Sequence, residues 1–183
     1  MFFNSLSGRF LLLTVGFVML AEVLIFVPSV ARFRMDYLQE RLELAQLATL
    51  ALLATTDDMV TPELADELLN NAEVLNIVLR RDEMRELILS RPMNAPITAT
   101  YDLRDANSFS LIFDALVTLF SSGEQVVRVI GRPIKGAGLE IETTLQLMPL
   151  RAAMIDYGRN IFLLSFLISI LSSTMLFFAV RGL

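Results

Sequence analysis

Two long apolar segments lie near the two ends of the chain. Residues 10–30 contain a single charged side chain, Glu22, and residues 161–180 contain none. A helix of about 20 residues is roughly 30 Å long, which matches the hydrocarbon core of a bilayer. We therefore expect two transmembrane helices, with a more polar domain of residues 31–160 between them.

The first apolar segment has an alternative interpretation as a cleaved signal sequence. The triplet Ser29-Val30-Ala31 fits the small-residue cleavage rule. The segment is, however, longer than the usual signal core of about 7–15 residues, and the helical pattern continues past Ala31. We predict an uncleaved anchor, and removal of the segment is the alternative.

Basic residues predict how the two segments cross the membrane. Residues 1–9 contain Arg9 and no acid, and Arg181 follows the second segment. Basic residues in a connection longer than about 60 residues do not count toward the positive-inside rule. We therefore expect residues 1–9 and 181–183 to be cytoplasmic and residues 31–160 to lie outside the cytoplasm.

A helix is predicted from residue 32 to residue 54, continuous with the first apolar segment. Its apolar positions recur with the 3.5-residue period of a coiled-coil seam. They include Met35, Leu38, Leu42 and Ala45, followed by Thr49 and Leu52. This spacing predicts a homodimer seam, and the alternative is a core helix of a monomer.

The rest of the domain is predicted to contain helices and strands. Thr61 and Pro62 are typical of a helix start, and that helix should end near Asn70. Residues 91–107 are rich in Pro, Asn, Asp and Thr and predict a loop, and residues 108–122 predict a buried helix on a sheet. Strands are expected at residues 74–80, 85–90, 125–132 and 139–147. Hairpin-like grouping of these strands favours an α+β fold with an antiparallel sheet flanked by helices.

The last predicted strand passes directly into a helix. Pro149 suits a first helical turn, and no loop separates it from the second apolar segment. Leu150, Met154, Tyr157 and Ile161 follow at spacings of four, three and four residues. We expect one continuous helix, which would transmit a shift of the sheet into the membrane.

Composition excludes several classes of function. Residues 31–160 contain 13 of the 15 basic and 19 of the 20 acidic residues, and this acidic balance argues against nucleic acid as a partner. The chain has no cysteine and no histidine. Disulfides, zinc sites of the His/Cys type and histidine bases are thus excluded. We expect no catalytic residues, metal or cofactor in this chain.

The segment "PLRAAMIDYGRNIFLLSFLISIL", residues 149–171, and the order of elements before it resemble a known family. They resemble the extracytoplasmic sensor region, PAS-like and Cache-type, of bacterial two-component sensor histidine kinases. The resemblance implies a sensor in the bacterial inner membrane with a periplasmic domain, whose kinase core would follow Leu183. The alternatives are the sensing module of a chemoreceptor or cyclase, and a structural bitopic scaffold.

The resemblance also implies a ligand, because sensors of this kind often bind small carboxylates. Arginine suits bidentate recognition of a carboxylate. Candidate ligand-binding residues are Arg80, Arg128, Arg132 and Lys135. The alternatives are a partner protein as the signal, and arginines that are merely solvated or paired with Glu140 and Glu142.

Polar residues inside the apolar segments are further candidates. Glu22 is an intramembrane acid, and such residues are often functional. The alternative is a protonated glutamate packed inside a helix bundle. Ser165 begins a stripe of small residues that suits close contact between helices, together with Ser169, Ser172 and Ser173. The alternative is that serines are simply tolerated in a transmembrane helix.

Overall fold

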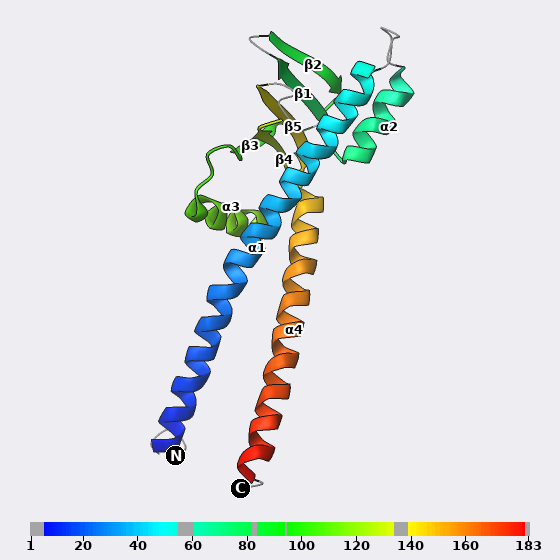
Figure 1. Cartoon of the computed structure of the whole chain (residues 1–183). Coiled ribbons are helices and arrows are strands. Elements are labelled where there is room, and N and C mark those ends of the chain that lie inside the picture. Colours follow the sequence, from blue (N-terminus) through cyan, green and yellow to red (C-terminus); the bar gives the residue numbers. More distant parts are fainter. Residues whose placement is uncertain (1–5, 55–60, 82–83, 94, 134–138, 182–183) are drawn as a thin grey trace.

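The computed structural model describes residues 6–54, 61–81, 84–93, 95–133 and 139–181. Two long helices leave a small mixed domain side by side, and both chain ends lie far from that domain (Figure 1). The longer helix, α1, is Leu6–Ala54, and its neighbour, α4, is Leu147–Arg181. The chain therefore enters and leaves the domain through the same pair of helices.

Both long helices are apolar enough and long enough to cross a membrane. Only 11% of the most apolar stretch of each is buried inside the molecule. A core helix of a soluble protein would instead bury most of that surface. As predicted, α1 continues past residue 30 without a break, so the Val30–Ala31 bond lies inside a helix with both side chains buried.

Helix α2, Pro62–Ala72, begins where the sequence predicts. The Thr61 hydroxyl accepts a hydrogen bond from the Leu64 backbone N–H at 3.3 Å. Glu73 ends the helix with a left-handed backbone, at φ 52°, and its N–H donates to the Asn70 carbonyl. The predicted end near Asn70 is therefore correct to within two residues.

The domain is built on one five-stranded sheet with the order β2-β1-β5-β4-β3. Four of its strands lie within two residues of the predicted bounds: β1 (Asn76–Arg81), β2 (Met84–Ser90), β4 (Val126–Gly131) and β5 (Glu140–Gln146). The pairs β1–β2, β1–β5 and β4–β5 are antiparallel. Together with the flanking helices this confirms a mixed fold of helices and a sheet.

The fifth strand, β3 (Ile97–Asp102), corrects two predictions. It lies within residues 91–107, where the sequence predicted a loop, and it pairs parallel with β4. The expectation of a purely antiparallel sheet is therefore wrong. Helix α3, Ser108–Phe120, connects β3 to β4, and a helical crossover brings the chain back to pair in the same direction.

Helix α3 also departs from its predicted environment. The sequence predicted a buried helix on the sheet, but α3 packs mainly against α1 and α4. Its start is capped as expected for a helix, with the Asn107 side chain accepting from the Ser110 N–H at 2.7 Å. Only Ala115 and Thr118 of α3 are buried, so much of its apolar surface is exposed.

The core lies between the sheet and α1. Ile77, Leu79, Val127, Val129, Ile141 and Leu145 form the core face of the sheet. Leu38, Leu42 and Ala45 of α1 are buried in the same cluster. A Cβ atom at Gly131 of β4 would lie 2.5 Å from Leu42 Cδ1, so this glycine permits the close approach of α1.

The predicted dimer seam is therefore occupied by contacts within one chain. Leu38, Leu42 and Ala45 are buried, and Met35 is half-buried. This arrangement favours the alternative interpretation, in which the 3.5-residue period belongs to a core helix. A homodimer that uses these four residues would have to displace the chain's own sheet.

Cysteine reactivity should distinguish the two roles of α1, since the chain has no native cysteine. Ala45 is 0% exposed and Leu47, on the same helix, is 63% exposed. We expect Leu47→Cys to react rapidly with a maleimide and Ala45→Cys to react slowly until denaturant is added. Rapid disulfide crosslinking between two chains that carry Ala45→Cys, in the folded protein, would instead support the predicted homodimer seam.

Candidate functional site

The face of the sheet opposite α1 carries the predicted ligand-binding arginines. Arg80 Nη1 lies 3.6 Å from Glu140 Oε1, and Arg128 Nε lies 3.7 Å from Glu142 Oε2. The neighbouring strand β5 supplies both glutamates, and both are buried. These ion pairs agree with the alternative that the sequence left open, in which Glu140 and Glu142 neutralise the arginines.

The other two predicted ligand residues are not brought to this cluster. Arg132 Nη2 lies 3.8 Å from Asp105 Oδ1, and 73% of the Arg132 side chain is exposed. Lys135 lies outside the described residues. Among the four candidates, the structure therefore places only Arg80 and Arg128 on one face, each beside a buried glutamate.

Arg104 joins this face and was not predicted from the sequence. It contacts Glu140, and its Nη2 lies 2.6 Å from Asp102 Oδ2. Hydrogen bonds from Arg104 hold the pKa of the Asp102 carboxyl below its usual value. Arg80, Arg104, Glu140 and Asp102 thus form one charge network across the β1, β5 and β3 strands. A ligand carboxylate at these arginines would compete with the internal carboxylates.

A second cluster lies on the other side of the sheet, around Arg34. This α1 residue is 0% exposed, and its Nε donates to the Thr118 hydroxyl of α3 at 3.0 Å. Its guanidinium carbon lies 4.1 Å from the ring centroid of Tyr101 on β3. One side chain therefore connects α1, α3 and β3, four residues after the end of the first apolar segment.

The charge of Arg34 is poorly solvated. Burial lowers the pKa of the guanidinium, and the nearby Tyr101 and Asp114 oppose that shift. Within the described residues, Nη1 and Nη2 of Arg34 have no hydrogen-bond partner. A buried cation with unpaired donors is costly, so its contacts with Thr118 and Tyr101 constrain how these three elements can move.

Strand β5 joins α4 with no residue between them. Strand β5 ends at Gln146 and α4 begins at Leu147, whose N–H donates to the Gln125 carbonyl at 2.8 Å. Leu147, Leu150 and Met154 are buried in the core. The continuous helix that the sequence predicts is thus present, and its first turns are part of the domain.

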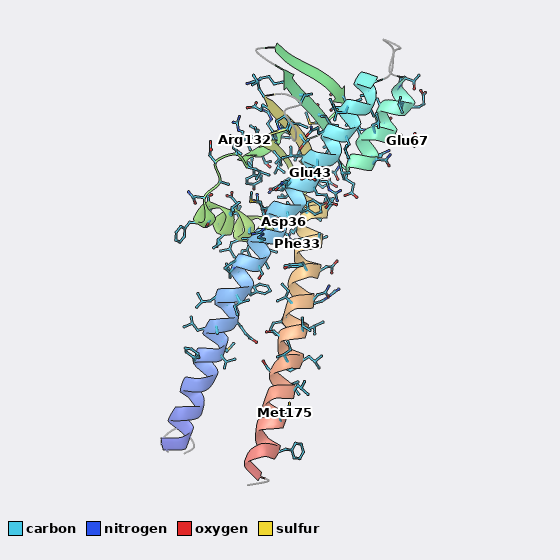
Figure 2. The ribbon with its side chains drawn as sticks, in the orientation of Figure 1. Phe33, Asp36, Glu43, Glu67, Arg132 and Met175 are labelled. Carbon is cyan, nitrogen blue, oxygen red and sulfur yellow. The ribbon has the colours of Figure 1, made fainter. Side chains whose placement is uncertain are left out.

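The predicted transmission residues face α1. Tyr157 stacks on Phe33 with ring centroids 4.3 Å apart, and Phe33 lies between the two long helices (Figure 2). Gly158 follows, and a Cβ atom there would lie 3.1 Å from Phe26 Cζ. Arg151 Nε donates to the Leu119 carbonyl of α3 at 3.0 Å. Leu150, Met154 and Tyr157 therefore contact α1 or the core, and α4 also contacts α3.

A groove of about 550 Å³ lies between the long helices below these contacts. Glu22 and Ile161 are among its lining residues, and the Ser165 hydroxyl donates to Glu22 Oε1 at 3.3 Å. Glu22 thus has a polar partner on the other helix. Farther along α4, the described side chains Ile168, Leu171 and Met175 are exposed. Figure 2 shows Met175 near the end of α4 that lies away from the domain.

These clusters gather charged, polar and aromatic side chains from several elements of the fold. Within the described part of the chain, no three His, Cys, Asp or Glu side chains are grouped to hold a metal. The groups that do converge are arginines, carboxylates, hydroxyls and aromatic rings. They connect the sheet, α3 and both long helices, so a displacement of one element must be accommodated by the others.

Comparison with known proteins identifies no relative. No protein-family model matches the sequence, no curated protein matches it, and no solved structure matches its fold.

A double-mutant cycle should measure the coupling of α1 to α3 through Arg34. Thr118→Val leaves Arg34 Nε without its acceptor, which should lower the free energy of unfolding by about 1–3 kcal/mol. Arg34→Met removes the charge, so adding Thr118→Val to it should cost less than Thr118→Val alone. Equilibrium unfolding of the detergent-solubilised chain measures these differences.

The control for this cycle is Ser121→Ala. Ser121 is the C-cap residue of the same helix, and its hydroxyl donates to the Val117 carbonyl at 2.7 Å in an exposed hydrogen bond. Its loss should change stability by less than the loss of the Thr118 hydroxyl, because water can replace the bond. Strict additivity of Arg34→Met and Thr118→Val would contradict the coupling.

Proposed function

We propose that this chain is the sensory and transmembrane portion of a bacterial two-component sensor histidine kinase. In this proposal, residues 31–160 are periplasmic and detect the signal, and both termini are cytoplasmic. The observation that carries it is the direct junction of β5 and α4. A central strand of the domain continues into an apolar helix without a loop that could absorb its movement.

The packing of α4 supports this mechanism. Leu150 and Met154 are anchored in the core, and Tyr157 stacks on Phe33 of α1. A change in the sheet would therefore move α4 relative to α1 by sliding or rotation, because closely packed helices shift as rigid elements. The kinase core that would follow Leu183 would receive this movement.

The charge network is the proposed input to the same mechanism. Glu140 and Glu142 belong to β5, the strand that continues into α4. A small carboxylate that replaces one of them at Arg80 or Arg128 would release a buried glutamate and change the environment of β5. A partner protein that binds this face would act through the same strand.

Other membrane receptors are compatible with this mechanism. A chemoreceptor or a cyclase would use the same junction, and the sequence that follows residue 183 in the parent protein would distinguish them. A structural bitopic scaffold would use the helices as anchors only. The domain's direct connection of β5 to α4 favours a receptor over a scaffold.

The proposed topology can be tested with single cysteines in cells. Glu67 is an exposed residue of α2 on the far side of the domain from the chain ends (Figure 2). We expect Glu67→Cys to react with a membrane-impermeant thiol reagent added outside the inner membrane. Ser5→Cys should react only after the membrane is permeabilised, and the reverse pattern would contradict the topology.

Insertions after Asp156 test signal transmission. A reporter kinase core fused after residue 183 supplies the readout, which is autophosphorylation. Two inserted glycines rotate the downstream helix by roughly 200° and weaken it by about 1 kcal/mol each. We expect kinase activity to be lost or locked.

Four alanines inserted at the same place are the matched control. They rotate the helix by only about 40° and keep it helical. They should preserve more regulation of the kinase than the two glycines. If both insertions leave regulation unchanged, α4 is only an anchor and the proposed mechanism is wrong.

A further inference from the structure

Helix α3 has an exposed apolar face that the contacts described above do not use. Phe109 is 86% exposed, Phe113 is 67% exposed and Phe120 is 83% exposed. Leu116 and Val117 are exposed beside them. Because successive helical residues are about 100° apart, these five side chains fall within an arc about 100° wide. Three phenylalanines side by side in water would be strongly unfavourable.

The remaining surface of α3 is already occupied. Ala115 and Thr118 are buried, and Thr118 holds Arg34. Ser110 and Ser121 lie on a polar flank, where their hydroxyls donate to the carbonyls of Asn107 and Val117. The helix therefore has one face on the protein, one polar flank and one apolar face that no described residue covers.

The position of α3 indicates what covers its apolar face. The helix lies beside α1 at a steep angle to the two long helices, near the level where these helices leave the sheet (Figure 1). Leu119 of α3 lines the groove between the long helices, together with Phe26 and Val30 of α1. Leu119 lies on the flank of α3 opposite Ser110 and Ser121. The exposed face of α3 is thus continuous with the apolar surface of the spans.

Arginines lie near the same level. The side chains of Arg32 and Arg159 are 82% and 64% exposed, at the ends of the two predicted spans. Long cationic side chains at such positions extend toward lipid headgroups while their stems cover apolar surface. Together with the phenylalanines of α3, they form a band with the composition of a membrane interface.

We propose that α3 is an interfacial helix that lies in the plane of the bilayer with Phe109, Phe113 and Phe120 inserted among the lipids. An in-plane amphipathic helix of this kind buries its apolar face about 5–10 Å into the boundary of headgroups and acyl chains. This inference rests on the proposed membrane spans. The helix contains no Lys or Arg, so its insertion depends on apolar burial and does not require anionic lipid.

The proposal gives α3 a role in signalling. Lipid on one face and Arg34 on the other would hold the α1–β3–α3 junction at a constant depth. The hydrogen bond from Arg151 to the Leu119 carbonyl links α4 to α3, so a shift of α4 would strain or break a contact with an element seated in the membrane. In this proposal, α3 stays fixed in the membrane interface while α4 shifts relative to it.

Single tryptophans test the insertion, since the chain has no native tryptophan. The full chain carrying Phe113→Trp is placed in phosphatidylcholine vesicles, with bromine either high on the acyl chain or near its end. We expect blue-shifted emission, and stronger quenching by bromine placed high on the chain. Phe120→Trp is a second variant of the same face and should behave alike.

Two controls separate this inference from the spans on which it rests. Phe166→Trp lies on an exposed position of α4 within the predicted span and should be quenched by brominated lipid. Leu47→Trp is equally apolar and exposed but lies at the far part of α1, and it should respond only to an aqueous quencher. If Phe166→Trp is not quenched by lipid, the spans themselves are wrong.

Two outcomes would overturn the interfacial helix while leaving the spans intact. If Phe113→Trp and Phe120→Trp respond to aqueous iodide and not to brominated lipid, the face is in water. If they are shielded from both quenchers while Phe166→Trp is quenched by lipid, a second copy of the chain or another protein covers the face.

Discussion

The packing of one face of α1 against the sheet is the constraint on which the rest of the structure depends. Leu38, Leu42 and Ala45 fill the core, and Gly131 lets the helix approach the sheet closely. Burying a leucine side chain contributes about 1.5–3 kcal/mol, so these contacts are a large part of the stability of a small domain. Because α1 is continuous with the first apolar segment, these contacts also determine the orientation of the domain relative to that segment.

Periodicity predicted most of the elements but could not identify their partners. The 3.5-residue spacing of α1 and the alternation in β5 both describe a buried face, and neither says whether a second chain or the same chain buries it. Extending the spacing back from Leu42 and Leu38 by four residues reaches Arg34, which is buried with them. That signal was present, but a charged residue at an apolar position is easily taken for the end of the pattern.

The errors in the prediction have a common physical cause. Strand β3 is short and lies among turn-forming residues, and its alternation of half-buried and exposed side chains spans only Ile97–Asp102. Without β3, α3 could not be seen as a crossover helix, and the parallel pairing with β4 was missed. The environment of α3 was therefore predicted incorrectly. An apolar helix of 13 residues suggests a protein core when neither a sheet edge nor a membrane is considered.

Strand β5 connects the two sides of the molecule. Its core face contributes Ile141 and Leu145, which pack in the cluster that holds α1, and its other face contributes Glu140 and Glu142. Arg80 and Arg128 are 40% and 36% exposed, so water screens these ion pairs, but removing an arginine would leave a buried carboxylate without its partner. The charged face is therefore sensitive to what binds there, while the apolar face is resistant to deformation. Under the proposed function, a strand with both properties, joined directly to α4, would convert a change of charge at one surface into a rigid-body displacement of a helix.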